Sequence, residues 1–401
     1  MSNSLLTPTA VTRKSLAILH SKLNFIGSVD RQYDKSFAKT GAKIGDTLKV
    51  RRPNKYTTRT GRVMDVQDTN ESSVNLTVGT QMGVDLAFTS VDLTLSLDDF
   101  AERILEPAMD QLASTIEGAV LSSIYKKVPN QVLQTGALTY DNALEAGQIL
   151  TEHLAPRGTR SNLLNPQQMR DLVNGTSTLF NNQTAIGRQY LEGLMGRAAG
   201  FDFFENTLMP RHLTGAAAGY LVNAVPTAAT DPYATQTIAV DTGTGSWNEG
   251  DVFTIAGVYE VHPETKAVTA RLQQFVVRTA TTGNATTISF TPSLVTSGAR
   301  QNVSNLPLDD AAITRSGAAS SYTSQGLAFQ KDAVAFVTAD LIMPDGVDWK
   351  AREQHDGISM RIIRQYDINN DLFPARIDVL WGSELMQPEL VVREASNQIA
   401  A

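Results

Sequence analysis

The chain has 401 residues, a formal net charge of −7 at pH 7 and no cysteine. The missing cysteine excludes a disulfide scaffold, a thiolate nucleophile, an iron–sulfur cluster and any zinc site with a Cys ligand. The length predicts about two or three domains with a sizeable core. An acidic chain of this kind is not expected to bind a polyanion over its whole surface. Charged residues make up only 19% of the chain, which is low for a soluble protein and suggests that other protein covers part of its surface.

The N-terminal stretch, residues 1–43, is predicted to form an arm. Apolar residues three and four positions apart predict a short amphipathic helix over residues 13–26. The first residues lack the apolar core of a secretory signal, and no segment approaches the roughly 18 apolar residues of a membrane span. We therefore expect an arm that docks on another chain, with a frayed terminus as the alternative. The apolar face consists of Leu16, Leu19, Leu23 and Ile26.

Residues 44–95 predict β structure, because apolar residues alternate along them. The alternation changes parity near Thr89 and Ser90, which predicts a bulge or a bend. We expect a long hairpin here. The alternating positions are Val74, Leu76 and Val78, then Val84, Leu86 and Phe88, and in the opposite parity Val91, Leu93, Leu95 and Leu97.

The tip of this hairpin, between Lys49 and Arg62, is polar and basic. Such a tip cannot bury itself well, so it is either a mobile loop or an arm that lies on a partner. Its single aromatic residue, Tyr56, does not make a stacking platform for single-stranded nucleic acid. We prefer the interaction arm. The basic residues are Lys49, Arg51, Arg52, Lys55, Arg59 and Arg62.

Residues 97–127 give the strongest helix prediction. Ser96 and Asp99 have the spacing of a capping box, apolar residues recur every four positions, and the helix would be about 46 Å long. Pro107 lies inside this segment and predicts a kink or a break. The apolar ridge consists of Phe100, Ile104, Ala108, Leu112, Ile116, Val120 and Ile124.

Four acidic residues also recur at every fourth position, on the face of this helix opposite the ridge. They are either an ordinary solvated face or a surface that meets a basic arm or repels nucleic acid. The four residues are Asp98, Glu102, Glu106 and Asp110.

The middle of the chain predicts an α/β or α+β core. A helix over residues 141–154 ends before Pro156, and a buried strand follows at 161–164. Asn165 then has the character of a helix N-cap, with Pro166 at the first helical position. A strand that leads through a cap into a helix is typical of such a core.

From residue 222 to 325 the composition changes to Thr, Ala, Gly, Ser and Val, and helical periodicity disappears. Short apolar runs separated by turn residues predict a small all-β domain inserted into the preceding one. Beyond it, residues 327–339 have mixed character, and residues 357–381 predict a long pair of β-strands.

No catalytic or metal-binding pattern stands out. The five histidines are scattered, so we expect them to be structural or exposed. The nucleophile elbow, the P-loop and the dinucleotide fingerprint are all missing. Asp367, Asn369 and Asp371 resemble the start of a calcium loop but lack its glycine and its flanking helices. We predict no enzyme activity, no metal and no cofactor.

Four stretches, taken in chain order, resemble the major capsid (coat) proteins of tailed bacteriophages with the Hong Kong 97-type fold. The resemblance is to the branch whose members carry an inserted β-barrel, the I-domain, and it spans most of the chain. The stretches are Leu163–Gln168, Ala199–Glu205 followed by Pro210, Asn248–Val258, and Gly326–Leu341.

The resemblance implies an α+β fold and a self-assembling icosahedral shell of pentamers and hexamers around double-stranded DNA, without sequence-specific DNA binding and without a membrane. A portal and a separate scaffolding protein would direct assembly in the bacterial host cytoplasm, and a decoration protein is a further candidate partner in the virion. The implied domains are an N-terminal arm (1–43), an extended β loop (44–96), a peripheral domain with a spine helix (97–160), an axial domain (161–221), the inserted β domain (222–325), the axial domain again (326–349), and peripheral return strands with the C-terminus (350–401).

The two charge stripes suggest how subunits join: the basic loop of one lies across the acidic helix of the next. Exposed ion pairs contribute about 0–1 kcal/mol each, but they would repeat over the whole shell. We expect no Lys–Asn cross-link. The alternatives are an encapsulin-like compartment around a cargo enzyme and a phage tail-tube or decoration protein. The predicted contact residues are Arg51, Arg52, Arg59 and Arg62 on the loop, and Asp98, Glu102, Glu106 and Asp110 on the helix.

Overall fold

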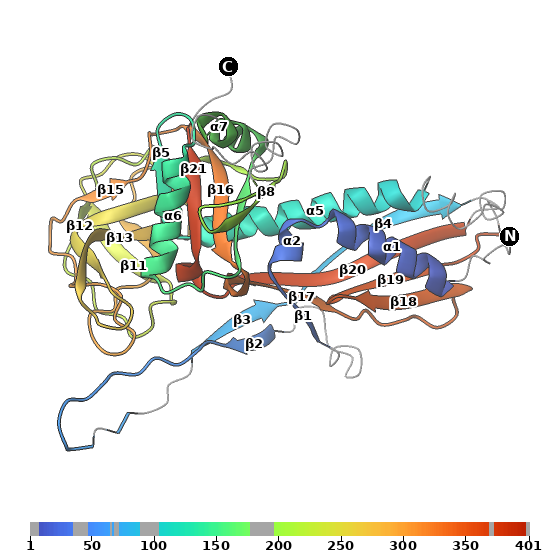
Figure 1. The fold of residues 1–401 in the computed structure, drawn as a ribbon, viewed down its shortest axis with the longest axis horizontal. Helices are drawn as coiled ribbons and strands as arrows, with labels where there is room; N and C mark the ends of the chain where they lie inside the picture. The colour runs from blue at the N-terminus through green and yellow to red at the C-terminus, as the bar shows by residue number, and fades with distance from the viewer. Residues whose placement is uncertain are drawn as a thin grey trace. The chain divides into compact units, whose positions relative to one another are not determined.

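The computed structural model describes residues 8–34, 47–64, 66–67, 72–88, 104–176, 196–368 and 373–397. The chain forms two compact units, each built from three stretches (Figure 1). Both units combine helices and sheets, so the predicted α+β class is confirmed. In the part of the chain that the structure describes, no helix is long and apolar enough to cross a membrane. The first unit comprises Met1–Val50, Ser73–Val120 and Val334–Met386, and the second comprises Arg51–Ser72, Leu121–Ala333 and Gln387–Ala401.

The first unit is built on a sheet with strand order β1-β17-β20-β19-β18, in which β4 also pairs with β20. Ile362 of β19 lies opposite Ile377 of β20, which confirms the β pair predicted over residues 357–381. Strands β2 and β3 form a separate two-stranded sheet. The strands are β1 (Asp30–Asp34), β2 (Thr47–Arg51), β3 (Ser73–Thr77), β4 (Thr80–Phe88), β17 (Val334–Ala339), β18 (Trp349–His355), β19 (Ile358–Arg364) and β20 (Phe373–Leu385). The parity change predicted at Thr89 and Ser90 lies outside the described residues.

The N-terminal segment forms two helices, α1 (Pro8–Lys22) and α2 (Phe25–Ser28), where the sequence predicted one. All four apolar residues of the predicted face are buried, so the face itself is confirmed. The interruption is stabilised by Glu117, whose carboxylate accepts hydrogen bonds from the backbone N–H of Asn24 (3.0 Å) and of Phe25 (2.7 Å). A buried acid at this point satisfies amides that a helix start leaves without a partner.

Helix α5 runs from Glu106 to Ile124, and the 3₁₀ turn η3 (Tyr125–Lys127) follows it. Residues 104 and 105 just before it form a π turn. Pro107 is the second residue of α5, which follows this π turn directly, so the regular α-helix is interrupted beside the residue where the sequence predicted a kink or a break. The α-helical part is about 28 Å long. The predicted capping box and residues 97–103 lie outside the described residues.

The second unit has a main sheet of order β5-β21-β16-β6-β8-β7, with β9 also on β16. The predicted strand-to-helix step is confirmed: Asn165 Oδ1 accepts from the backbone N–H of Gln168 (2.8 Å), and Pro166 is the first residue of α7. The elements are β5 (Gln131–Gln134), α6 (Tyr140–Glu152), β6 (Arg160–Leu164), α7 (Pro166–Thr176), β7 (Arg197–Ala198), β8 (Phe201–Glu205), β9 (Arg211–Leu213), β16 (Tyr322–Gln330), the 3₁₀ turns η4 (Lys331–Ala333) and η5 (Pro388–Leu390), and β21 (Val391–Ser396).

The second unit also contains strands β10 to β15, which correspond to the inserted β domain predicted over residues 222–325. Its sheet has the order β10-β11-β14-β13-β12-β15. It has a hydrophobic core of its own, in which the rings of Phe253, Phe275 and Phe290 lie 5.2–5.7 Å apart and Trp247 is buried beside them. The strands are β10 (Leu221–Val222), β11 (Gln236–Asp241), β12 (Val252–Val261), β13 (Val268–Val277), β14 (Thr287–Thr291) and β15 (Ile313–Arg315).

The capsid domain boundaries read from the resemblance stay a prediction. In the range assigned to the second part of the axial domain, 326–349, strand β16 belongs to the second unit and β17 to the first. In the range assigned to the peripheral return, 350–401, strands β18 to β20 belong to the first unit and β21 to the second.

Candidate functional site

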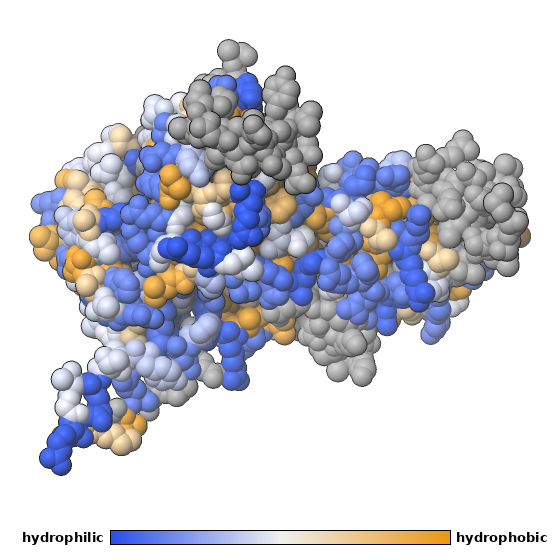
Figure 2. Space-filling model, viewed as in Figure 1, coloured by the Kyte–Doolittle hydropathy of each residue, from blue (hydrophilic) through white to orange (hydrophobic). Residues whose placement is uncertain are grey.

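The segment between β2 and β3, which we call the extended loop (residues 51–72), is exposed along most of its described length. Its described residues beyond Arg51 have no regular secondary structure. At its base the backbone N–H of Arg52 donates to the oxygen of Ser72 (2.9 Å), so the two arms start side by side. Hydrophobic and hydrophilic side chains share its far end (Figure 2). The exposed apolar residues are Tyr56 (60%), Val63 (85%), Met64 (75%) and Val66 (73%).

The four predicted contact arginines of the loop differ in their surroundings. Arg51, Arg59 and Arg62 are exposed, and Arg59 donates to the backbone oxygen of Gly61. Arg52 is half-buried, because its guanidinium lies over the ring of Tyr233, 3.6 Å from the centroid. Arg59 and Arg62 are therefore accessible to another molecule, whereas the side chain of Arg52 already contacts Tyr233 inside this one.

Of the four predicted acidic residues, Asp98 and Glu102 lie outside the described residues. Glu106 and Asp110 are one turn apart at the start of α5, where both bind Lys22 of α1. The Nζ atom of Lys22 is 3.5 Å from Glu106 Oε1 and 3.1 Å from Asp110 Oδ1. The hydrogen bond to Asp110, together with the two negative charges, raises the pKa of Lys22. Both carboxylates stay about half exposed, so a second cation can still approach them.

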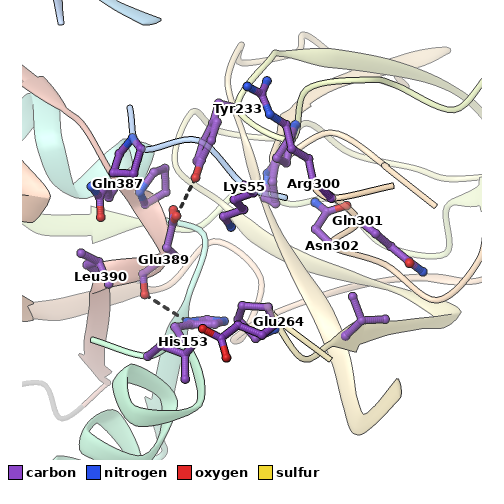
Figure 3. Close-up of a pocket in the computed structure, with 18 of the residues that line it drawn as sticks. Lys55, His153, Tyr233, Glu264, Arg300, Gln301, Asn302, Gln387, Glu389 and Leu390 are labelled. Carbon is purple, nitrogen blue, oxygen red and sulfur yellow. Dashed lines mark hydrogen bonds between the residues drawn. The ribbon is translucent and has the colours of Figure 1, made fainter. Parts of the chain in front are cut away.

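Tyr233 connects the loop base with two other parts of the second unit. It belongs to the inserted β domain, its ring carries Arg52, and its hydroxyl donates to Glu389 Oε1 of η5 (2.6 Å; Figure 3). Burial, and then the charge of Glu389, raises the pKa of this tyrosine. Tyr233 thus stays a neutral donor to a charged acceptor, which makes a strong hydrogen bond.

A second link joins the inserted domain to the same turn. His153, just after α6, donates from Nδ1 to the backbone oxygen of Glu389 (3.0 Å) and pairs through Nε2 with Glu260 of β12. Arg271 of β13 binds the other oxygen of Glu260 at 2.9 and 2.7 Å. Burial alone would raise the pKa of Glu260, but His153 and Arg271 outweigh it and lower that pKa. Glu260 is therefore held as a charged, paired group.

A cavity of about 710 Å³ lies next to these links (Figure 3). Residues 53–56 and Thr58 of the loop form one wall, and the inserted domain and η5 form others. Lys266 Nζ donates to the backbone oxygens of two lining residues, Pro263 (2.7 Å) and Gln301 (3.2 Å). Burial, with the charge of Lys55, lowers the pKa of Lys266 to about 8. The cavity contains no cluster that suggests catalysis.

Buried polar groups hold the inserted domain to the rest of the second unit at a place that we call the neck. It consists of His212, Gly215, Gly250, Asp251 and Arg393. His212 Nε2 is 2.9 Å from Asp251 Oδ1, and Asp251 also accepts from the backbone N–H of Gly215 at 3.0 Å. Arg393 donates to the backbone oxygen of Gly250 (2.6 Å) and is fully buried, which lowers its pKa to about 10. Burial also lowers the pKa of His212.

Sequence reasoning identified the loop and its arginines but not these links. Tyr233 and His153 lie 156 and 236 positions from Glu389, and no local pattern connects them. His153 and His212 are structural, as predicted for the histidines. Across the described ranges, no group of three His, Cys, Asp or Glu side chains could hold a metal ion.

Comparison with known proteins gives one family match. The family model described as "P22 coat protein - gene protein 5" matches residues 16–393. No curated protein matches the chain.

Solved structures resemble the chain at low identity. The mature capsid of bacteriophage PhiM1 is 12% identical over 94% of this chain and 88% of that one, with a TM-score of 0.44. A structure from Mycobacterium phage Che8 is 10% identical over 90% and 88%, with a TM-score of 0.43. The CUS-3 coat protein I-domain is 27% identical over 25% of this chain and 94% of that one, with a TM-score of 0.20.

Proposed function

This chain belongs to the P22 coat protein family, so it is a major capsid protein of a tailed-phage head, and we propose that its copies form the pentamers and hexamers of an icosahedral shell. The family is one of structural proteins and not of enzymes, and the protein resides in the virion capsid. The resemblance stated from the sequence is confirmed for the family and for its Hong Kong 97-type fold with an inserted domain.

The extended loop is the observation that carries the proposed mode of assembly. Four of its apolar side chains are 60–85% exposed, although its base is well ordered by backbone pairing. Apolar side chains grouped at the end of a protruding loop mark an interaction surface. Each buried apolar side chain stabilises a contact by about 1.5–3 kcal/mol. We place the neighbouring subunit of the shell over this loop end.

The charged side chains determine which surface of the next subunit the loop contacts in this proposal. In the proposal, Arg59 and Arg62 of one subunit approach Glu106 and Asp110 of the next, with Asp98, Glu102 and Arg51 as further members. Lys22 already neutralises part of the acidic side within its own subunit. An incoming arginine therefore shares the carboxylates with a lysine, and each pair contributes at the low end of about 0–1 kcal/mol.

The other proposed partners follow from family membership and charge. A separate scaffolding protein and a portal would direct assembly, and a decoration protein is a further candidate. Double-stranded DNA would be enclosed and not gripped, which agrees with a net charge of −7.

Electron microscopy of the purified chain, with and without scaffolding protein, tests this function. We expect closed shells from the wild-type chain. Arg59→Glu/Arg62→Glu should abolish or slow shell formation while leaving the far-UV circular dichroism spectrum unchanged. The matched control is Arg59→Lys/Arg62→Lys, which keeps both charges and should assemble. Normal shells from the charge-reversed variant would exclude the proposed pairing.

A further inference from the structure

Tyr233 is placed so that one side chain can control the direction of the whole extended loop. Its ring carries the guanidinium of Arg52, 3.6 Å from the centroid. Arg52 is the residue whose backbone N–H closes the loop base on Ser72 at 2.9 Å. A contact at this residue therefore holds both arms of the loop at once.

Tyr233 is itself held on several sides. Its hydroxyl donates to Glu389 at 2.6 Å, and its backbone N–H donates to Asp231 Oδ1 at 3.3 Å. Asp231 is in turn bound to the rest of the inserted domain, because Ser293 Oγ donates to its backbone oxygen at 2.6 Å and Arg300 lies 3.6 Å from its carboxylate. The ring under Arg52 is thus a fixed platform.

The loop beyond this base behaves as one lever. Its arms are tied together halfway out, where the backbone N–H of Thr57 donates to Gln67 Oε1 at 2.9 Å and Gln67 Nε2 donates to the oxygen of Thr57 at 2.6 Å. Behind residues 53–58 lies the cavity of about 710 Å³, so no packed core supports the loop on that side (Figure 3). Rotation at the base is therefore transmitted to the end.

The consequence for the loop end is large. Arg62 lies ten positions after Arg52. A fully extended chain rises about 3.3 Å per residue, so the loop end lies at most roughly 33 Å from its base. A rotation of about 10° at the base then moves the end by up to roughly 6 Å, twice the length of a hydrogen bond.

We propose that Tyr233 is the positioning residue through which the inserted β domain sets the direction of the extended loop, and with it the angle between neighbouring subunits. The proposal rests on the proposed function only in its second part, that the loop lies on a neighbouring copy. The inserted domain then determines the curvature of the shell, because a fixed loop direction gives shells of one size.

Two variants break the contact from opposite sides. Tyr233→Ala removes the aromatic ring, and Arg52→Ala removes the cation from the other side of the contact; unchanged far-UV circular dichroism spectra check that both variants fold. The matched control is Tyr259→Ala, a partly exposed tyrosine elsewhere in the inserted domain. The first readout is trypsin cleavage of the unassembled chain after Lys55, Arg59 and Arg62. The bond after Arg52 precedes Pro53, which trypsin does not cut, so Arg52→Ala removes no cleavage site.

A cation over an aromatic ring contributes the equivalent of about 2- to 30-fold in an equilibrium. We expect each variant to accelerate loop cleavage by a factor in that range, and the double variant to add nothing further. The second readout is the shell diameter by electron microscopy, which should broaden in both variants and stay uniform in the control.

If both single variants were cleaved at the wild-type rate, the proposal that the contact between Arg52 and Tyr233 holds the loop would be overturned. Accelerated cleavage with uniform shells of wild-type diameter would overturn the part that concerns curvature. A wild-type chain that forms no shell would contradict the proposed function instead, and the cleavage assay would still decide whether Tyr233 holds the loop.

Discussion

Replacing Glu394 by glutamine should stabilise the protein above pH 7. Glu394 lies on β21 in the main sheet of the second unit, fully buried. Its two carboxylate oxygens accept from the same donor, Asn162 Nδ2, at 3.0 and 3.1 Å. Burial raises the pKa of Glu394 from 4.5 to about 7, against the opposing effect of the Asn162 hydrogen bond.

The sign and size follow from linkage between protonation and folding. The folded state holds its proton up to about pH 7, whereas the unfolded chain releases it near 4.5. The contribution of the neutral carboxyl is therefore fully present below pH 4.5 and is lost as the pH rises through 7. A difference of about 2.5 pKa units corresponds to about 3 kcal/mol, and full burial means that solvent does not screen it.

Glutamine keeps the shape of the neutral acid and cannot ionise. Its amide can also donate to Asn162 Oδ1, which has no hydrogen-bond partner among the described residues. Urea denaturation followed by circular dichroism at pH 5, 6, 7 and 8 measures the effect. We expect Glu394→Gln to exceed the wild type by about 3 kcal/mol at pH 8 and by less at pH 5. The exposed Glu205→Gln is the control. A difference that does not change with pH would refute the reasoning.

Two further predictions concern the inserted domain. A Cβ at Gly243 would lie 2.1 Å from the ring of Tyr220, so Gly243→Ala should lower the free energy of unfolding sharply. The control is Gly158→Ala, which has open space around it and should change that free energy little. Equal thermal melting temperatures of the two variants would contradict this prediction. Asp251→Ala leaves the buried His212 without its hydrogen-bond acceptor and should cost about 1–3 kcal/mol in urea denaturation, because burial lowers the pKa of His212 and the side chain left behind is neutral. A loss below 1 kcal/mol would show that the neck is not fixed by this pair.

Much of the fold follows from local sequence signals. Asn165 and Pro166 predict the start of α7 because both act within one turn of the chain. The alternation of apolar residues predicts β19 and β20 because side-chain direction in a strand depends only on the neighbouring residues. The spacing of apolar residues three and four positions apart likewise predicts the buried face of the N-terminal segment, on which Leu16 and Leu19 lie.

Other features depend on distant partners and could not be predicted. The break between α1 and α2 is stabilised by Glu117, more than 90 residues away. The predicted helix over residues 97–127 is confirmed from Glu106 to Ile124, and its first residues lie outside the described part of the chain. The contact of Arg52 with Tyr233 joins residues 181 positions apart, and a basic residue in a polar loop carries no sign of it.

The family match also decides among the functions that the sequence left open. It favours a phage head over an encapsulin-like compartment and over a tail-tube or decoration protein, because the matched model is that of a coat protein. The pairing of the loop arginines with the acidic helix stays a prediction. The occupation of Glu106 and Asp110 by Lys22 refines it, since those carboxylates are shared and not vacant.

The central claim is that the extended loop of each subunit is completed by a neighbouring copy. An electron cryomicroscopy map of the shell assembled from the wild-type chain tests it most directly. The account predicts a closed icosahedral shell in which Tyr56, Val63, Met64 and Val66 are buried against the adjacent subunit. A shell in which these side chains stay exposed to solvent, or tubes in place of shells, would contradict it.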